Sequence, residues 1–529
     1  MSDAQRDVRH GVVRAVGSIG LATLLSRILG FVRDMVVARA FGAGPVTDAF
    51  FVAFRIPNLL RRLLAEGALS TAFIPVFTSS LTHDGRAGFR RMLRAVAGAT
   101  AVALCAVSVL GMLAAPWIVR VMAPGWTSDP GQIGLAADLT RFMFPYLVLV
   151  GLASLGMAAL NAHHRFFTAA LGPAVLNVAM ILAVLVLAVR MAPPILALAV
   201  GVLVGGAGQF LVQLPELRRL GVPLWPSAEW RHPAVRAIAG RLWPAVFALA
   251  AVQVTVLVNT LLASLLPQGT VSYLYYADRV MEFPLGVFGI ALASASLPVM
   301  SRQAAGKDHR ALAGTLNFAL RLALYVSLPA TVGLVMLRTP IVRVLFERGR
   351  FGAAETSATA DALAWYAVGL VAFAGSRIAA QAFYALGEAG TAVKWGIVSV
   401  VANVAAAAAM MGPLGHAGLA GASSIGAYVN LLALLVVARR RFGRLGGRTL
   451  VSTACRTSLA SLPLVGSCWL ALALWPARPS LPLDVAWLAT TIVVGGGFFW
   501  VASVALGISE RTVLLRLYRR RERGGIEEA

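Results

Sequence analysis

Acidic residues, lysines and cysteines are all scarce in this chain of 529 residues. It has 22 aspartates and glutamates, three cysteines, and lysine only at positions 307 and 394. Charged residues make up 13% of the chain, hydrophobic residues make up 59%, and the mean hydropathy is +0.80. This composition excludes an ordinary soluble protein and is typical of a multi-spanning helical membrane protein. No stretch is long and polar enough to form a separate soluble domain.

Motifs for enzymatic or metal chemistry are also missing. The three cysteines, Cys105, Cys455 and Cys468, stand in apolar runs without a CxxC pair, so we expect small buried hydrophobic side chains and neither a disulfide nor a metal site. A glycine-rich stretch at residues 201–208 lies within an apolar helix, where small residues favour close helix packing over nucleotide binding. No HExxH, P-loop or Ser/His/Asp arrangement stands in a plausible context, so we expect no catalytic residues and no enzyme.

The charge that is present is strongly positive. A formal net charge of +24 would suggest nucleic acid as the partner of a soluble protein. Here the arginines gather in alternate loops, as the positive-inside rule requires, and no nucleic acid is expected. This distribution predicts that both termini are cytoplasmic. The arginines before the first apolar run and the absence of a small-residue cleavage site favour an uncleaved first helix.

Apolar runs recur along the whole chain. They predict an all-α polytopic protein with about fourteen transmembrane helices of roughly 20 residues each. The expected centres are Leu25, Leu60, Cys105, Leu149, Ile181, Leu203, Val254, Val287, Tyr325, Val371, Val401, Leu431, Pro463 and Val494. Residues 343–350 are the exception to the positive-inside pattern, because they are basic but follow a span that ends outside. We expect them to form a short interfacial helix.

Weak matches along the chain indicate a duplication. Ala53-Phe-Arg55 resembles Ala277-Asp-Arg279, and Leu176-Asn-Val-Ala179 resembles Ala402-Asn-Val-Ala405, at common offsets of about 222–226 positions. An even number of spans in each copy predicts two parallel six-helix lobes. The expected divisions are a cytoplasmic extension (1–14), an N-lobe (15–221), a C-lobe (222–448), a C-terminal helix pair (449–507) and a basic cytoplasmic tail (508–529).

Ionisable residues within the spans are the strongest functional signal. An ionised side chain at mid-membrane costs roughly 2.5–3.5 kcal/mol, so such residues usually face a wet cavity. Guanidinium binds phosphate oxygens through two parallel hydrogen bonds and keeps its proton, which suits a diphosphate cargo. The alternative for each residue is a structural ion pair or an arginine snorkelling to the interface. The candidates are Arg27, Arg33 and Asp34 in the first span, Asp48, Arg55, Arg62 and Glu66 in or near the second, and Arg279 and Glu282 in the eighth.

Four motifs resemble the MurJ (MviN) family of bacterial lipid II flippases. They are Ser26-Arg-Ile-Leu-Gly-Phe-Val-Arg-Asp34, Thr47-Asp-Ala-Phe-Phe-Val-Ala-Phe-Arg-Ile-Pro-Asn-Leu-Leu-Arg-Arg62, Ala65-Glu-Gly-Ala-Leu-Ser70 and Tyr275-Tyr-Ala-Asp-Arg-Val-Met-Glu-Phe-Pro-Leu-Gly-Val287. The resemblance extends over about residues 15–507. It implies the multidrug/oligosaccharidyl-lipid/polysaccharide (MOP) exporter fold, with two lobes around a central cavity and a last helix pair bordering a groove for a polyprenyl tail.

The resemblance also implies a cargo and a location. The cargo would be lipid II, the undecaprenyl-diphosphate-linked peptidoglycan precursor, moved by alternating access to the outer leaflet of the bacterial cytoplasmic (inner) membrane for cell-wall synthesis. Membrane lipids, and beyond them the cell-wall synthesis machinery, are the implied partners. No cofactor is expected. The membrane potential is the expected driving force, and the coupling ion stays open because the eleventh span offers only Asn403.

Motif by motif, the family implies functional positions in this sequence. Substrate binding is implied for Arg27, Arg33, Arg61 and Arg279. Supporting or gating roles are implied for Asp34, Asp48, Asn58, Arg62, Glu66 and Glu282. The acidic members would hold arginines in place or latch the lobes. The rival interpretation is a flippase of the same superfamily for another polyprenyl-diphosphate-linked oligosaccharide, of the O-antigen type.

Overall fold

The computed structural model is helical throughout the part that it describes, residues 3–61, 69–222, 225–476 and 480–512, and these residues contain no strand. The chain divides into two compact units, Met1–Ser272 with Arg348–Phe351, and Tyr273–Glu347 with Gly352–Ala529. The expected division of the two lobes at residue 221 stays a prediction. The helix Pro233–Ser264 belongs to the first unit, where it packs on helices α3 and α4.

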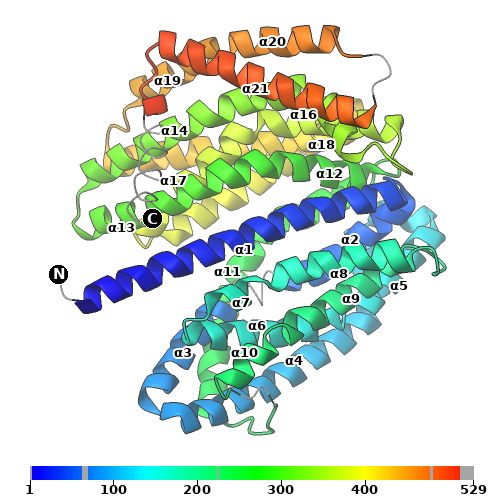
Figure 1. Ribbon diagram of the computed structural model, residues 1–529, viewed down its shortest axis with the longest axis vertical. Helices are drawn as coiled ribbons and strands as arrows, with labels where there is room; N and C mark the ends of the chain where they lie inside the picture. Colours follow the sequence, from blue (N-terminus) through cyan, green and yellow to red (C-terminus); the bar gives the residue numbers. More distant parts are fainter. Residues whose placement is uncertain (1–2, 62–68, 223–224, 477–479, 513–529) are drawn as a thin grey trace. The chain divides into compact units, whose positions relative to one another are not determined.

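The first unit is a helical bundle coloured from blue to green in Figure 1. Its helices are α1 (Asp3–Phe41), α2 (Pro45–Arg61), α3 (Leu69–His83), α4 (Gly85–Met122), η2 (Pro124–Ser128), α5 (Pro130–Met143), α6 (Tyr146–Ala162), α7 (Phe166–Ala170), α8 (Gly172–Leu187), α9 (Leu196–Leu211), α10 (Leu214–Arg219) and α11 (Pro233–Ser264). The long α1 packs along α8 and α7, which fixes the face of α1 that is buried.

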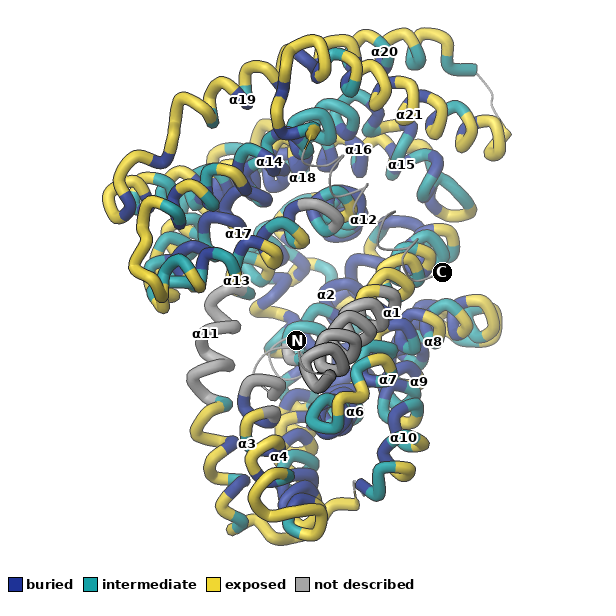
Figure 2. The backbone as a smooth tube through the Cα atoms, turned by 60° about the vertical axis from the view of Figure 1, so that its left-hand side comes forward, coloured by how far each residue is buried: buried dark blue, intermediate teal, exposed yellow. Residues whose placement is uncertain are grey.

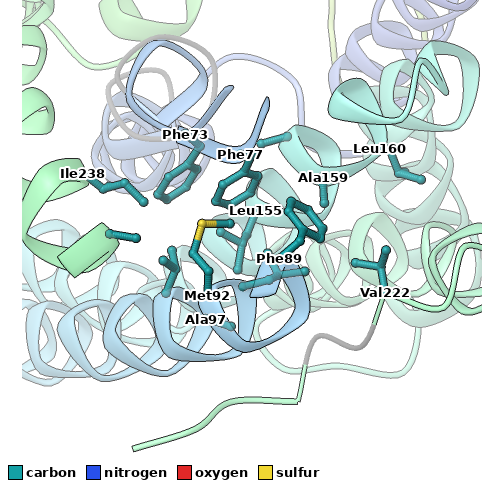
Figure 3. Packing of buried hydrophobic residues seen from close by; sticks show 14 of the residues in the cluster. Phe73, Phe77, Phe89, Met92, Ala97, Leu155, Ala159, Leu160, Val222 and Ile238 are labelled. Atoms are coloured by element: carbon teal, nitrogen blue, oxygen red, sulfur yellow. The ribbon is translucent and has the colours of Figure 1, made fainter. Parts of the chain in front are cut away.

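Aromatic side chains organise one core of this unit. Phe73 and Phe77 of α3 stack with ring centroids 5.4 Å apart, and Phe77 meets the edge of Phe89 from α4 at 5.8 Å. Leu155 of α6 and Ile238 of α11 close the cluster, as Figure 3 shows. Burial of these large apolar side chains, together with aromatic pairs worth about 0.5–1.5 kcal/mol each, joins four helices into one body.

The glycine-rich stretch of α9 is a packing surface, which confirms the interpretation from the sequence. A Cβ atom on Gly201 would lie 2.8 Å from the Cα atom of Met180, and one on Gly205 would lie 2.9 Å from the Cα atom of Leu176. Both neighbours are backbone atoms of α8, so neither can move aside. Only glycine lets the two helices approach this closely.

The second unit contains the remaining helices, from green to red in Figure 1. They are α12 (Thr270–Pro284, which begins in the first unit), η3 (Leu285–Ile290), α13 (Ala291–Ala305), α14 (His309–Met336), α15 (Arg338–Phe346), α16 (Ala353–Val368), α17 (Leu370–Ala385), α18 (Ala389–Phe442), α19 (Gly447–Ala460), α20 (Leu462–Ala473) and α21 (Leu481–Ala505). Its core joins Tyr325 of α14 to Phe499 of α21, with ring centroids 5.3 Å apart.

Six of the described helical segments are long and apolar enough to cross a membrane, or seven if the bent pair α16–α17 is one span. The chain is thus a multi-pass membrane protein, while the expected number of fourteen spans stays a prediction. Part of the difference has a simple origin. The expected spans around Val401 and Leu431 both lie in α18, a helix of 54 residues that is interrupted at Gly415, where φ is 54°.

Large apolar side chains also cover much of the outer surface. Leu113 and Trp117 of α4 are 72% and 69% exposed, and exposed positions extend along α19 and α20 in Figure 2. The expectation of three buried cysteines is wrong for two of them, because Cys105 and Cys455 lie on this surface and only Cys468 is buried. In a membrane protein, lipid as well as the core accepts apolar side chains, so hydrophobicity alone does not predict burial.

The expected interfacial helix also has different bounds. Helix α15 begins at Arg338 and ends at Phe346, and the following residues form a turn in which Gly349 has a φ of 62°. This turn, Arg348–Phe351, belongs to the first unit, where the Arg350 N–H donates to the carbonyl of Arg39 at 3.0 Å. The basic run after the ninth expected span is therefore half helix and half turn.

Candidate functional site

Helix α1 carries a buried ion pair. The Nη2 atom of Arg33 lies 2.6 Å from Oδ1 of Asp34, and Nε donates to the same oxygen at 3.0 Å. The two side chains are only 8% and 3% exposed. Charges buried this deeply need a partner, since an unpaired one costs several kcal/mol. The structure therefore matches the alternative considered for Arg33, a structural ion pair.

Asn177 of α8 completes this group. Its Oδ1 accepts from Nη1 of Arg33 at 3.1 Å, and its Nδ2 donates to the carbonyl oxygen of Ser26 at 3.0 Å. Gly30 leaves the space, because a Cβ atom there would approach Asn177 Nδ2 to 3.3 Å. Asn177 thus holds both the backbone of α1 and the guanidinium of Arg33.

Arg27 lies two turns earlier on α1 in a different environment. Its side chain is exposed, as are its neighbours Leu24 and Ile28. Among the described residues it forms no hydrogen bond or ion pair. A guanidinium without a protein partner retains all five donors for an anion. The structure therefore separates Arg27 from Arg33, which the sequence grouped together.

Asp48 of α2 binds the beginning of another helix. Its Oδ2 accepts from the N–H of Gly269 at 2.6 Å, and its Oδ1 accepts from the N–H and Oγ of Ser272 at 2.8 Å and 2.6 Å. The carboxylate is 1% exposed. A negative charge here satisfies N–H groups that helix α12 leaves unpaired and interacts favourably with its dipole. Asp48 thereby ties α2 to the first turn of α12.

The last turn of α2 contains a second amide–arginine pair. Oδ1 of Asn58 accepts from Nε of Arg61 at 3.1 Å and from Nη2 at 2.9 Å. These residues are three apart, so they share a face of the helix. Arg62 and Glu66, the other candidates of this region, lie outside the described residues.

Arg279 of α12 is held by its own helix. Its Nη1 donates to Oε2 of Glu282 at 3.0 Å, its Nη2 donates to the hydroxyl of Tyr275 at 3.2 Å, and the guanidinium lies 5.1 Å from the centre of the Tyr275 ring. The arginine and glutamate side chains are 30% and 40% exposed. These contacts orient the guanidinium, and the side chain is partly exposed.

Each of the contacts described above lies within one helix or joins a candidate to one other helix. Arg33 pairs with Asp34, Arg61 with Asn58, and Arg279 with Glu282, whereas Arg27 stands apart. Reasoning from the sequence did not propose Asn177, Tyr275 or Ser272 as part of the site. The sequence could have indicated Asn177, because this residue stands in one of the matched segments of the duplication. Asp48 and Ser272 are 224 positions apart, which is within the offset of the duplication, so they stand at equivalent positions of the two copies.

The Arg33–Asn177 contact is testable with a double-mutant cycle. Asn177→Ala removes two hydrogen bonds from a buried guanidinium and a carbonyl, so we expect a loss of about 1–3 kcal/mol in stability. Arg33→Ala should cost about 3–5 kcal/mol, because Asp34 would be left buried without its partner. The measurement is thermal unfolding of detergent-purified protein. A coupling energy of about 0.5 kcal/mol or more is expected for residues in contact, and purely additive effects would contradict the role of Asn177.

The arginines of this site are oriented by amide, hydroxyl and carboxylate groups. Such guanidinium groups can bind the oxygen atoms of an anion without reacting with it. No group of three or more His, Cys, Asp or Glu residues in the described part of the chain could hold a metal ion. The arrangement suits recognition of a phosphate-bearing molecule and offers no activated nucleophile.

The comparisons with known proteins agree with one another. The family model "Lipid II flippase MurJ" matches residues 37–483. The lipid II flippase MurJ of Burkholderia cenocepacia is 40% identical over 81% of this chain and 84% of its own length. The probable lipid II flippase MurJ of Haemophilus influenzae is 32% identical over 93% of this chain and its entire length.

Solved structures show the same fold. A lipid II flippase MurJ in an inward closed conformation has a TM-score of 0.78 at 23% identity and covers 94% of this chain and 99% of its own. An inward-facing multidrug resistance transporter of the MATE family, in the MOP superfamily, has a TM-score of 0.65 at 17% identity and covers 80% and 96%. The extent of the family match and the identity to these relatives establish that the chain belongs to the lipid II flippase MurJ family.

Proposed function

We propose that this protein is a transporter that moves lipid II from the inner to the outer leaflet of the bacterial cytoplasmic membrane. The observation that carries the proposal is the 40% identity to a lipid II flippase over most of both chains. The multi-pass helical structure and the match to the family model of a lipid II flippase support a transporter over an enzyme.

The diphosphate is the part of this cargo that the candidate site fits best. Arg27 in the first unit is exposed and unpaired among the described residues, and Arg279 in the second unit is oriented by Tyr275 and Glu282. Each would contact the diphosphate during the transport cycle through charge-assisted hydrogen bonds. Arg33 would act indirectly, by holding α1 in place through Asp34 and Asn177.

The polyprenyl tail needs an exposed apolar surface. The last helices offer one, because Leu462 and Trp469 of α20 are 60% and 65% exposed, and Val493 and Val501 of α21 are 73% and 66% exposed. In this proposal the tail stays in contact with lipid and these helices while the polar headgroup is transferred.

Alternating access would move the headgroup, and the membrane potential would give the movement its direction. With the cell interior negative, each net negative charge moved outward gains roughly 2.3 kcal/mol per 100 mV. The gain falls if the cavity arginines move through the field with the diphosphate. Cytoplasmic termini and contact with the cell-wall synthesis machinery complete the proposal, and the clustering of arginines in alternate loops supports the orientation.

Complementation tests the function. A bacterium depleted of its native flippase would express this chain, and the precursor exposed on the outer leaflet would be quantified. We expect restored exposure of lipid II. Good expression in the membrane without any exposed lipid II would contradict the proposal. Restored export of an O-antigen-type lipid in its place would establish the rival cargo.

A further inference from the structure

A second cationic site lies in the second unit and shares no lining residue with the candidates discussed above. A pocket of about 360 Å³ is lined by three arginines, Arg321 of α14 and Arg448 and Arg456 of α19, together with the residues that follow α21. Helix α19 packs against both α14 and α21 (Figure 1). A volume of about 300–1,000 Å³ is usual for small-molecule sites, so the pocket has room for an anionic group.

Helix α19 presents a polar stripe to this pocket. Arg448, Ser452 and Arg456 stand at intervals of four residues and therefore share one face of the helix. Both arginines are exposed, and neither forms an ion pair with any residue that the structure describes. Their donors are available, and the hydroxyl of Ser452 lies between them on the same face.

Arg321 forms the fixed wall of the pocket. It makes an ion pair with Glu510, its Nε donates to Oγ1 of Thr453 at 3.2 Å, and its Nη2 donates to Oγ of Ser509 at 2.9 Å. Within the described part of the chain, this leaves Nη1 without a hydrogen bond. The network thus fixes the guanidinium and keeps donor capacity for a further acceptor.

Glu510 does not cancel the positive charge of the pocket. Burial alone would raise the pKa of this carboxyl, but hydrogen bonds from its own backbone N–H, Arg321 and Ser509 hold the pKa below its ordinary value. The carboxylate is therefore ionised and is satisfied by Arg321. Three arginines against one glutamate leave an excess of two positive charges, supplied by Arg448 and Arg456.

The surface beside the pocket is apolar. Val451, Cys455 and Leu459 of α19 also stand four residues apart, one position away from Ser452 and Arg456, and all three are exposed. One position is 100° on a helix, so an apolar stripe runs next to the polar one. A phosphate group bound by the arginines would place any attached acyl chains on this stripe.

We propose that this pocket binds a phosphate group, and that its occupant is the headgroup of an anionic phospholipid. Guanidinium donors match phosphate oxygens, and the adjacent apolar stripe matches the acyl chains of a lipid. Free phosphate shares the headgroup chemistry and is the other source that the experiment distinguishes. Neither Arg27 nor Arg279 lines the pocket, so its occupation can be tested independently of transport.

Thermal stabilisation of the detergent-purified full chain provides the test. The probes are dioctanoyl-phosphatidylglycerol, dioctanoyl-phosphatidylcholine and inorganic phosphate, each titrated to saturation. We expect saturable stabilisation by phosphatidylglycerol and none by phosphatidylcholine. The double variant Arg448→Ala/Arg456→Ala should weaken this binding at least about tenfold, because two charge-assisted contacts are lost.

A matched variant controls for surface charge. Arg440→Ala/Arg444→Ala removes two other exposed arginines that do not line the pocket, and it should bind phosphatidylglycerol as the wild type does. Saturable binding of inorganic phosphate with the same loss in the first variant would establish a phosphate site open to soluble anions. Equal weakening in both variants, or no saturable binding of any probe by the wild type, would overturn the proposal. Unfolding without probe verifies that both variants fold, and the result is independent of lipid II export.

Discussion

Replacing Arg27 by alanine is expected to abolish lipid II export while leaving the protein folded. The side chain is exposed and has no polar partner among the described residues, so its loss breaks no hydrogen bond or ion pair within them. A charge-assisted hydrogen bond to the diphosphate is worth about 1.5–3 kcal/mol, which corresponds to about a 10- to 100-fold weaker interaction. The measurement is the precursor exposed on the outer leaflet of a strain depleted of its own flippase.

Two further variants test whether the effect is specific to the arginines of the site. Arg279→Ala should also abolish export, since it removes a guanidinium that Tyr275 and Glu282 hold in position. Arg190→Ala removes the same charge from an exposed turn and should export normally. Normal export by Arg27→Ala at wild-type expression would remove this residue from the substrate site. Equal loss in Arg190→Ala would point to a general effect of charge.

Asp48→Ala is expected to lower stability by about 3 kcal/mol or more, because buried hydrogen bonds from Gly269 and Ser272 to a charged group are lost together. Asp48→Asn should also destabilise, although it has nearly the same shape. Each carboxylate oxygen of Asp48 accepts a hydrogen bond from a backbone N–H. The side-chain amide of an asparagine would place its NH₂ group against one of these N–H donors, so one hydrogen bond would be replaced by a repulsive contact. The measurement is the unfolding midpoint of the purified protein in detergent.

A surface carboxylate provides the control for Asp48. Asp138 of α5 is 68% exposed and pairs with Arg141, so the same two substitutions there should change stability by no more than about 0.5 kcal/mol. If Asp48→Asn were as stable as the wild type, the capping of α12 would contribute little. If Asp48→Ala and Asp138→Ala lowered stability by the same amount, the burial of Asp48 would have no energetic consequence.

Local patterns in the sequence explain some of the contacts at the candidate site, while the roles of its residues stay predictions. Arg279 and Glu282 are three residues apart on one helix, so helix geometry alone brings them together, and the same holds for Asn58 and Arg61. The glycines of α9 predicted close helix packing, because small residues at helical spacing leave room for a neighbouring backbone. The identity of that neighbour, α8, required the structure.

The sequence by itself determined the all-helical, membrane-spanning character of this protein and its place in the MurJ family, because composition and local motifs depend on neighbouring residues only. The tertiary structure decided which charged side chains are bound by other residues of the protein. Arg27 and Arg33 look alike in the sequence, yet Asn177, 144 positions from Arg33, completes the burial of one arginine, and no described residue binds the other. The partners of Asp48 and the arginine pocket of α19 arise in the same way. Contacts between distant segments depend on which helices pack together, and helix periodicity indicates the packing face of a helix but not its neighbour.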